Sequence, residues 1–174
     1  MQMDVGLDTG AMIKKKSVPI RPATTSESLH DFLSAIGGSL IGEVVEELAT
    51  KGTLASTPQP NEGSTYAKML KKEDGRIDWN ANALFIDRQI RALNPWPGTW
   101  CESGKGRRVK ILEAVVMPMK SDEPAGSVID EDGVVACGDG TTLKLEAVQP
   151  ESKKPMSISE AMRGGHIAAG RTLT

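Results

Sequence analysis

One aspartate in this sequence stands where it could take part in acid–base chemistry. Asp8 lies in the loop Gly6-Leu-Asp-Thr-Gly10, between two glycines. An aspartate in such a position is usually a turn residue that hydrogen-bonds to its own backbone. A carboxylate within hydrogen-bond reach of a substrate amine can instead serve as a general acid or base. From the residues alone, both interpretations of Asp8 stay open.

Two clusters of basic residues could bind phosphate groups. Residues 1–63 hold 5 basic and 8 acidic residues and residues 64–174 hold 16 and 15, so bulk charge does not indicate a nucleic-acid partner. The clustering favours one, because lysine and arginine bind a phosphate backbone by charge. The alternative is an ordinary solvated surface. The clusters are Lys68, Lys71, Lys72 and Arg76, and Lys105, Arg107, Arg108 and Lys110.

The cysteines and histidines do not have the spacing of metal ligands. Cys101 and Cys137 form no CxxC or Cys/His pattern and are predicted to be small apolar residues on strands. His30 and His166 are predicted to be solvated. We therefore expect no metal site. Because no secretory or membrane-spanning segment is recognisable, we expect a reducing, cytoplasmic location and no membrane partner.

The N-terminal part predicts two strands followed by a long helix. Residues 1–5 alternate between apolar and polar side chains, and residues 12–20 form a second, less regular extended run. Thr24 and Glu27 have the spacing of a capping box, and the helical pattern continues to about residue 50.

This helix carries one apolar stripe that the predicted strands are too few to cover. The glycines at positions 37 and 38 should weaken or kink the helix. Two strands with an open edge do not make a sheet that can bury the stripe, so we expect further structure upstream of this sequence. The stripe consists of Leu29, Phe32, Leu33, Ile36, Leu40, Val44 and Leu48.

A second helix is predicted between Trp79 and Pro95, after a segment rich in proline and small residues at positions 52–64. Asp78 or Asn80 could cap it. Its apolar stripe consists of Ala83, Ile86, Ile90 and Leu93. All three tryptophans, at positions 79, 96 and 100, lie beside this helix and indicate a hydrophobic nucleus. We expect Trp96 and Trp100 to pack in the core rather than stack on bases.

Beyond Trp100 the pattern changes to short strands, predicted at residues 109–117, 126–129, 134–137 and 142–148. Strands at this spacing are typical of a small antiparallel barrel. A short helix should follow over residues 156–162, because Ser157 and Glu160 have capping-box spacing.

Four segments along the chain carry a family resemblance. They are Arg76-Ile-Asp-Trp79, Ile90-Arg-Ala-Leu-Asn-Pro-Trp-Pro97, Gly138-Asp-Gly140 and Lys153-Lys-Pro-Met-Ser157. In order and spacing they resemble the C-terminal half of methionyl-tRNA formyltransferases. The resemblance implies an α/β fragment of a Rossmann-like formyltransferase domain followed by a mainly β, OB-like barrel domain with flanking helices. It implies a catalytic-domain piece at 1–51, an interdomain linker at 52–70 and an OB-like C-terminal domain at 71–174.

The resemblance also implies a reaction, the transfer of a formyl group from 10-formyltetrahydrofolate to the amino group of methionyl initiator tRNA. Asp8 would be the catalytic aspartate, and Val5, Gly6, Leu7 and Asp8 would line the folate site. The family's Asn-x-His and Ser-Leu-Leu-Pro elements do not occur in this sequence, and Ala11 stands where the family usually has an acidic residue. We therefore expect a chain truncated before the Asn-x-His element and inactive by itself.

Initiator methionyl-tRNA is the partner that the resemblance implies. The candidate contacts are Lys68, Lys71, Lys72, Arg76, Arg88, Arg91, Lys105, Arg107, Arg108 and Lys110. The full-length protein is expected to be a monomer, and a fragment is expected to self-associate. Two alternatives remain: a catalytically dead tRNA-binding module, and a fragment of a related sugar-nucleotide formyltransferase.

Overall fold

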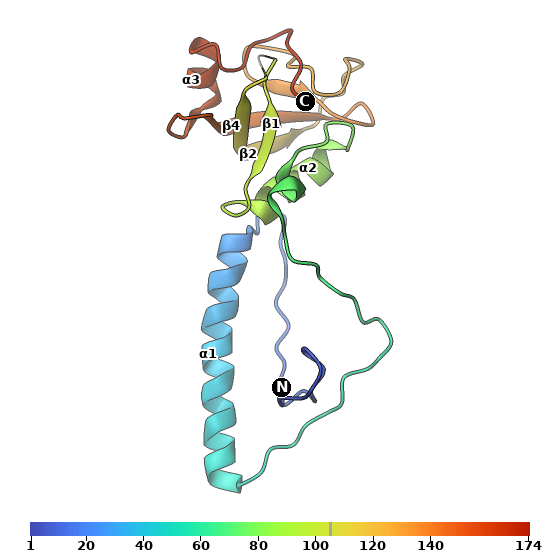
Figure 1. Cartoon of the computed structure of the whole chain (residues 1–174), viewed down its shortest axis with the longest axis vertical. Helices are drawn as coiled ribbons and strands as arrows, with labels where there is room; N and C mark the ends of the chain where they lie inside the picture. Colours follow the sequence, from blue (N-terminus) through green and yellow to red (C-terminus); the bar gives the residue numbers. More distant parts are fainter. Residues whose placement is uncertain (105) are drawn as a thin grey trace. The chain divides into compact units, whose positions relative to one another are not determined.

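The computed structural model describes residues 1–104 and 106–174 and divides the chain into two compact units (Figure 1). Unit 1 is Met1–Met69 and unit 2 is Leu70–Thr174. In the described part of the chain, no helix is both long enough and apolar enough to cross a membrane.

Unit 1 is built around one long helix, α1 (Ser26–Lys51). Its cap is a reciprocal pair in which Ser28 N–H donates to the Thr25 hydroxyl at 3.1 Å and Thr25 N–H donates to the Ser28 hydroxyl at 3.0 Å. The predicted capping pair was wrong by one position, because the Thr24 hydroxyl accepts from Arg21 N–H at 2.9 Å in the preceding turn. The helix is unbroken through the two glycines and ends at Gly52, which adopts the left-handed conformation with φ 72°.

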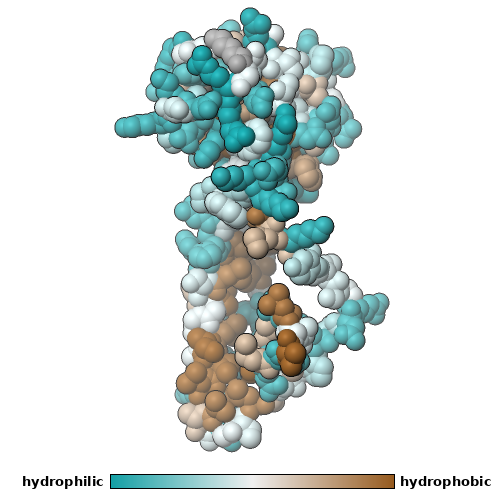
Figure 2. Space-filling model, viewed as in Figure 1, coloured by the Kyte–Doolittle hydropathy of each residue, from teal (hydrophilic) through white to brown (hydrophobic). Residues whose placement is uncertain are grey.

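The apolar stripe of α1 is only partly covered within unit 1, with Leu29, Ile36, Leu40 and Val44 half-buried. No residue of the helix is buried, and Phe32, Leu33 and Leu48 are about half exposed. Figure 2 shows this hydrophobic surface along the helix. The elements of this unit are too few to bury the stripe, as the sequence predicted.

The two N-terminal strands predicted at residues 1–5 and 12–20 do not form. The described backbone there is irregular, apart from one bridge in which Met12 and Thr57 exchange two hydrogen bonds of 2.8 Å. A strand is stable only when a neighbouring strand pairs with its backbone, and alternation along one segment cannot supply that neighbour.

Unit 2 contains an antiparallel sheet with the strand order β1-β2-β4-β3, and β5 pairs with β4. The strands are β1 (Thr99–Glu102), β2 (Arg108–Met117), β3 (Val134–Ala136), β4 (Thr142–Pro150) and β5 (Met156–Ser157). Sequence analysis predicted β2, β3 and β4 with small differences at their ends. It missed β1 and β5, which are too short to show a reliable alternation.

The sheet curls, and hydrogen bonds connect its two outer strands through segments that are not strands themselves. A bulge between Ile111 and Ala114 interrupts the register of β2 with β4 and bends the sheet. Residues 126–129, predicted as a strand, instead form isolated bridges to β3 and to residue 172. Thr174 in turn exchanges hydrogen bonds of 2.6 and 3.0 Å with Glu102 of β1.

Two helices flank the sheet. In α2 (Ala83–Leu93) the cap is Asn82, whose side chain accepts from Phe85 N–H at 2.9 Å. The predicted caps Asp78 and Asn80 instead form a turn with each other, since Asn80 N–H donates to the Asp78 carboxylate at 3.0 Å. In α3 (Ile158–Arg163) the predicted capping box of Ser157 and Glu160 is confirmed.

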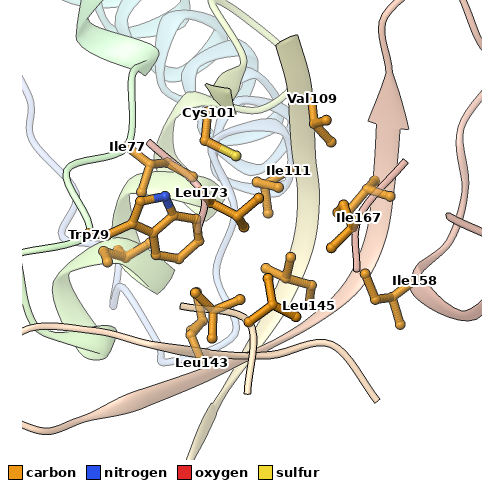
Figure 3. Packing of buried hydrophobic residues seen from close by; sticks show 14 of the residues in the cluster. Ile77, Trp79, Cys101, Val109, Ile111, Leu143, Leu145, Ile158, Ile167 and Leu173 are labelled. Carbon is orange, nitrogen blue, oxygen red and sulfur yellow. The ribbon is translucent and has the colours of Figure 1, made fainter. Parts of the chain in front are cut away.

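The core of unit 2 lies between α2, α3 and the concave side of the sheet (Figure 3). The predicted stripe of α2 is buried, and the Trp79 ring packs beside Ile77 and Leu173. The expectation that Trp96 and Trp100 pack in the core was wrong, because Trp96 is 61% exposed and Trp100 is only half-buried. The neighbouring Asn94 holds this turn instead of Trp96. Its side-chain amide donates to the carbonyls of Ile111 and Leu112 at 3.1 and 3.2 Å.

Replacing Ile86, which is fully buried, should destabilise unit 2 far more than replacing its exposed neighbour Leu84. Ile86→Ala removes core contacts and leaves a cavity, so we expect it to lower the free energy of unfolding by about 2 to 5 kcal/mol. Leu84→Ala, with 48% of the side chain exposed, should cost roughly 0.5 kcal/mol or less. Urea unfolding followed by tryptophan fluorescence measures both. Equal losses in the two variants would contradict this placement of α2.

Candidate nucleic-acid interface

Trp100 lies on the outer face of β1, at the centre of a basic surface. It pairs directly with Lys110 across the β1–β2 ladder, and side chains at paired positions share a face. Arg108, two residues before Lys110, lies on that same face. The alternate positions Cys101 and Val109 are buried in the core. The sheet therefore presents Trp100, Arg108 and Lys110 together on its outer face.

The segment before α2 brings a further arginine to this face. Ile77 N–H donates to the Trp100 carbonyl at 2.9 Å, and the Trp100 indole N–H donates to the Lys72 carbonyl at 3.2 Å. From α2, the Gln89 amide donates to the carbonyls of Asp74 and Arg76 at 2.9 and 3.1 Å. These bonds hold the backbone on both sides of Arg76 against β1.

The close approach of this segment requires a glycine at position 75. A Cβ atom there would lie 2.0 Å from the Gly98 carbonyl oxygen, which is far inside contact distance. Gly75 is buried for the same reason. Any larger residue would push the segment, and the arginine that follows it, away from β1.

Arginines from both sequence clusters meet on the Trp100 ring. The Arg108 Cζ lies 3.8 Å from the ring centroid, and the Arg76 Cζ lies 5.5 Å from it. Both distances are within the range of a cation–π interaction, which is strongest with tryptophan. A guanidinium held in this way can still direct its N–H groups to a phosphate. We call Arg76, Trp100, Arg108 and Lys110 the Trp100 surface.

The remaining candidates for tRNA contacts do not join this surface. Lys68 belongs to unit 1, and Lys105 lies outside the described residues. Arg88 is exposed on α2, and Arg91 is paired with Asp87 at 2.9 Å.

Lys71 and Lys72 are exposed just before Arg76. Arg107 is next to Arg108 in the sequence, but its side chain lines a cavity near His166 and not the Trp100 surface.

In unit 1 the loop that contains Asp8 is an exposed turn. Asp8 has a left-handed backbone, with φ 56°, and Val5 and Leu7 are almost fully exposed. The Gln59 amide holds the loop by donating to the carbonyls of Asp8 and Gly10 at 2.8 Å each. Sequence analysis placed Gln59 in the linker, and no local pattern could reveal a contact that spans about fifty residues.

Neither cysteine is a nucleophile in the folded protein. Burial raises the pKa of Cys101 from 9.0 to about 12, with a smaller contribution from the Glu102 charge. Burial likewise raises the pKa of Cys137 to about 12. Both thiols are buried at or beside strands, as predicted. Among the described residues, no three histidine, cysteine or acidic side chains gather where they could bind a metal ion.

Comparison with known proteins gives consistent matches. Residues 69–166 match the family model described as the C-terminal domain of formyl transferases. The methionyl-tRNA formyltransferase of Paramagnetospirillum magneticum is 48% identical over 173 residues, which cover 99% of this chain and 55% of that protein. The chain thus spans about half the length of the curated relatives it matches.

Two solved structures have the same fold at low sequence identity. HypX from Aquifex aeolicus in complex with tetrahydrofolic acid is 17% identical, with a TM-score of 0.58 over 91% of this chain and 28% of that one. An N-formyltransferase from Helicobacter canadensis in complex with folinic acid and dTDP-3-aminofucose is 18% identical, with a TM-score of 0.60 over 85% of this chain and 53% of that one. At these identities the likeness concerns the fold alone.

The raised pKa values of the two cysteines predict slow alkylation of the native protein. At pH 8, iodoacetamide should modify Cys101 and Cys137 only after unfolding in urea, because the neutral, buried thiol is the stable form. Folded thiols with raised pKa values contribute stability below pH 9, and this contribution is lost as the pH rises from about 9 towards 12. Mass spectrometry measures the labelling. Rapid native labelling of either thiol would contradict the burial described above.

Proposed function

The chain belongs to the formyltransferase family through its match to the C-terminal domain, and from this premise we propose that it serves formyl transfer to initiator tRNA. The donor would be 10-formyltetrahydrofolate and the acceptor the amino group of methionyl initiator tRNA, in the cytoplasm. Relatives named methionyl-tRNA formyltransferase, at 40–48% identity over nearly the whole chain, support this choice over a sugar-nucleotide substrate.

Within this function we assign three parts to the chain. Residues 1–51 are a piece of a Rossmann-like catalytic domain, residues 52–70 are the interdomain linker, and residues 71–174 are an OB-like domain. The incompletely covered apolar face of α1 supports the first part, because such a face normally packs on a sheet. The hydrogen bonds that connect β3 to β1 through residues 126–129 and 171–174 support a closed barrel for the third.

The loop with Asp8 would contribute one wall of the folate site, made of Val5, Gly6, Leu7 and Asp8. Its exposed, left-handed turn, held by Gln59, leaves the Asp8 carboxylate accessible to a substrate amine. Acid–base assistance alone does not make a formyltransferase, since the tetrahedral intermediate also needs groups that stabilise its oxyanion. The sequence has no Asn-x-His element to provide them.

The basic outer face of unit 2 would bind the phosphate backbone of the tRNA. The observation that carries this assignment is the meeting of Arg76 and Arg108 on Trp100, which joins two clusters that lie about thirty residues apart. Arg108 covers the indole at 3.8 Å, so this ring positions guanidiniums instead of stacking on bases. The surface therefore recognises charge and backbone, which suits a structured RNA.

Salt dependence tests the binding surface. If Arg76, Arg108 and Lys110 each neutralise one phosphate, the log–log plot of tRNA affinity against salt should have a slope near −2 to −3. The double change Arg76→Gln/Arg108→Gln should reduce that slope by about 1.5, because two phosphate contacts are lost. Filter binding or fluorescence anisotropy measures it on the full chain.

The matched control is Lys154→Gln/Arg163→Gln, which removes the same charge from exposed positions of unit 2 that are outside the Trp100 surface. It should leave the slope nearly unchanged. A slope that responds equally to both double variants would mean that only total charge matters. A slope that responds to neither would remove the support for the Trp100 surface.

The incomplete catalytic constellation predicts that residues 1–174 alone do not transfer formyl groups. An assay with 10-formyltetrahydrofolate and charged initiator tRNA should show no turnover above background. Turnover comparable to that of a complete formyltransferase would mean that the catalytic groups lie among the residues present and that their assignment here is wrong.

A further inference from the structure

A second basic region lies away from the Trp100 surface, around a cavity of about 260 Å³. A smaller cavity of about 30 Å³ adjoins it, and the two share Ser103, Gly165 and His166. Their walls come from the turn between β1 and β2, the turn after β4 and the segment after α3. No family motif or comparison assigns a ligand to this place.

Buried residues form an apolar floor that holds these walls in position. Val109, Ile167 and Leu173, each no more than 2% exposed, line the cavities from the core side. Figure 3 shows these three side chains among the packed hydrophobic residues. The floor is therefore part of the folded core and not a surface groove that could collapse.

Backbone geometry fixes His166 at the edge of this floor. Gly165, just beyond the end of α3, has the left-handed conformation with φ 63°, and His166 N–H donates to the Ala161 carbonyl at 2.9 Å. The imidazole folds back towards Gly164, where an added Cβ would lie 3.0 Å from its Cδ2 atom. Ser103, only 7% exposed, is the other hydrogen-bonding side chain common to both cavities.

The rim of the cavities is positively charged. Arg107 and Lys153 line the smaller cavity beside a single carboxylate, Glu151, and Arg171 lines the larger one. In the described part of the chain, none of the three cations forms an ion pair. The stem of Arg171 crosses the turn at Gly104, with 3.6 Å between its Cβ and the position that a Cβ of residue 104 would occupy. Three segments thus each contribute one cation to this pair of adjoining cavities.

We propose that these cavities bind a small phosphate monoester, with the phosphoryl group at the basic rim and the sugar or nucleoside on the apolar floor. A phosphate monoester carries a charge of about −1.5 to −2 at neutral pH, which matches three cations facing one carboxylate. Arginine N–H groups can bind its oxygens in pairs, and the Ser103 hydroxyl and the His166 imidazole can donate further hydrogen bonds. The volume lies near the lower end of ligand sites and suits a molecule of this size.

This site is independent of the tRNA surface, because its cations belong to a different set of side chains. Arg107 and Arg108 are neighbours in sequence, but Arg107 lines the cavity and Arg108 covers Trp100. Phosphate binding here does not require that the Trp100 surface bind RNA, so the two proposals can fail separately.

Nuclear magnetic resonance titration of the full chain with uridine 5′-monophosphate tests the proposal. We expect saturable shifts of the His166 ring and of the amides of Gly165 and Ile167. Two controls should each bind at least tenfold more weakly: uridine, which lacks the phosphoryl group, and inorganic phosphate, which lacks the nucleoside. Arg171→Gln and Lys153→Gln should each raise the Kd roughly tenfold, because each removes a charge-assisted hydrogen bond.

The controls are Arg163→Gln and Lys120→Gln, at exposed positions outside both the cavity lining and the Trp100 surface, which should change the Kd less than twofold. Amide spectra of each variant establish that it is folded, and Lys153→Gln decides the outcome should Arg171→Gln not fold. The proposal is overturned by an absence of saturable shifts at millimolar ligand, by equal binding of uridine or inorganic phosphate, or by a loss of affinity that follows Arg163 instead of Arg171.

Discussion

The strict alternation of side chains along the β1–β2 hairpin is the constraint on which the rest of unit 2 depends. Cys101, Val109 and Ile111 are essentially inaccessible to solvent, so the positions between them must face outward. That requirement places Trp100 and Arg108 on the outer face. A shift of one residue in the register would bury the cations and expose the core, so the register is strongly specified.

The basic surface is rigid because its support lies in the core. Backbone hydrogen bonds and the indole N–H attach the segment before α2 to β1, and Gln89 of α2 holds that segment from the other side. The guanidinium of Arg108 then lies on a ring whose own position is fixed. Charged side chains that are already held in place lose less conformational entropy when they bind a phosphate. A small number of contacts can therefore contribute more to the affinity. Unit 1 differs, since α1 has no buried side chain.

Sequence patterns predicted the parts of this structure that local physical chemistry determines. The buried stripe of α2, the capping box at Ser157 and the strands β2 and β4 follow from periodicity and from capping preferences. The patterns also identified the two clusters of basic residues, but they did not show that Arg108 lies on the Trp100 surface while Arg107 lines the cavity near His166. That division depends on the β1 strand, which is only four residues long and was not predicted.

Apart from the caps of α1 and α2, the predictions that were wrong concern contacts between distant residues. Alternation at residues 1–5 predicted a strand, but pairing requires a partner that the segment itself does not reveal. Trp96 and Trp100 were expected in the core because prolines flank them and other aromatic residues are scarce, but Trp96 is exposed and Trp100 is half-buried. The Asn94 amide makes the contacts that fix the turn beside Trp96. The role of Gln59 in holding the Asp8 loop had no sequence signal.

The most direct test of phosphate binding at the Trp100 surface is to follow the arginine side-chain N–H resonances of the full chain as initiator tRNA is added. The proposed surface predicts that the Nε–H signals of Arg76 and Arg108 shift together, with the same apparent Kd as the Trp100 indole N–H. It also predicts that these shifts disappear at high salt. Binding that leaves all three signals unmoved while other arginines shift would contradict this assignment.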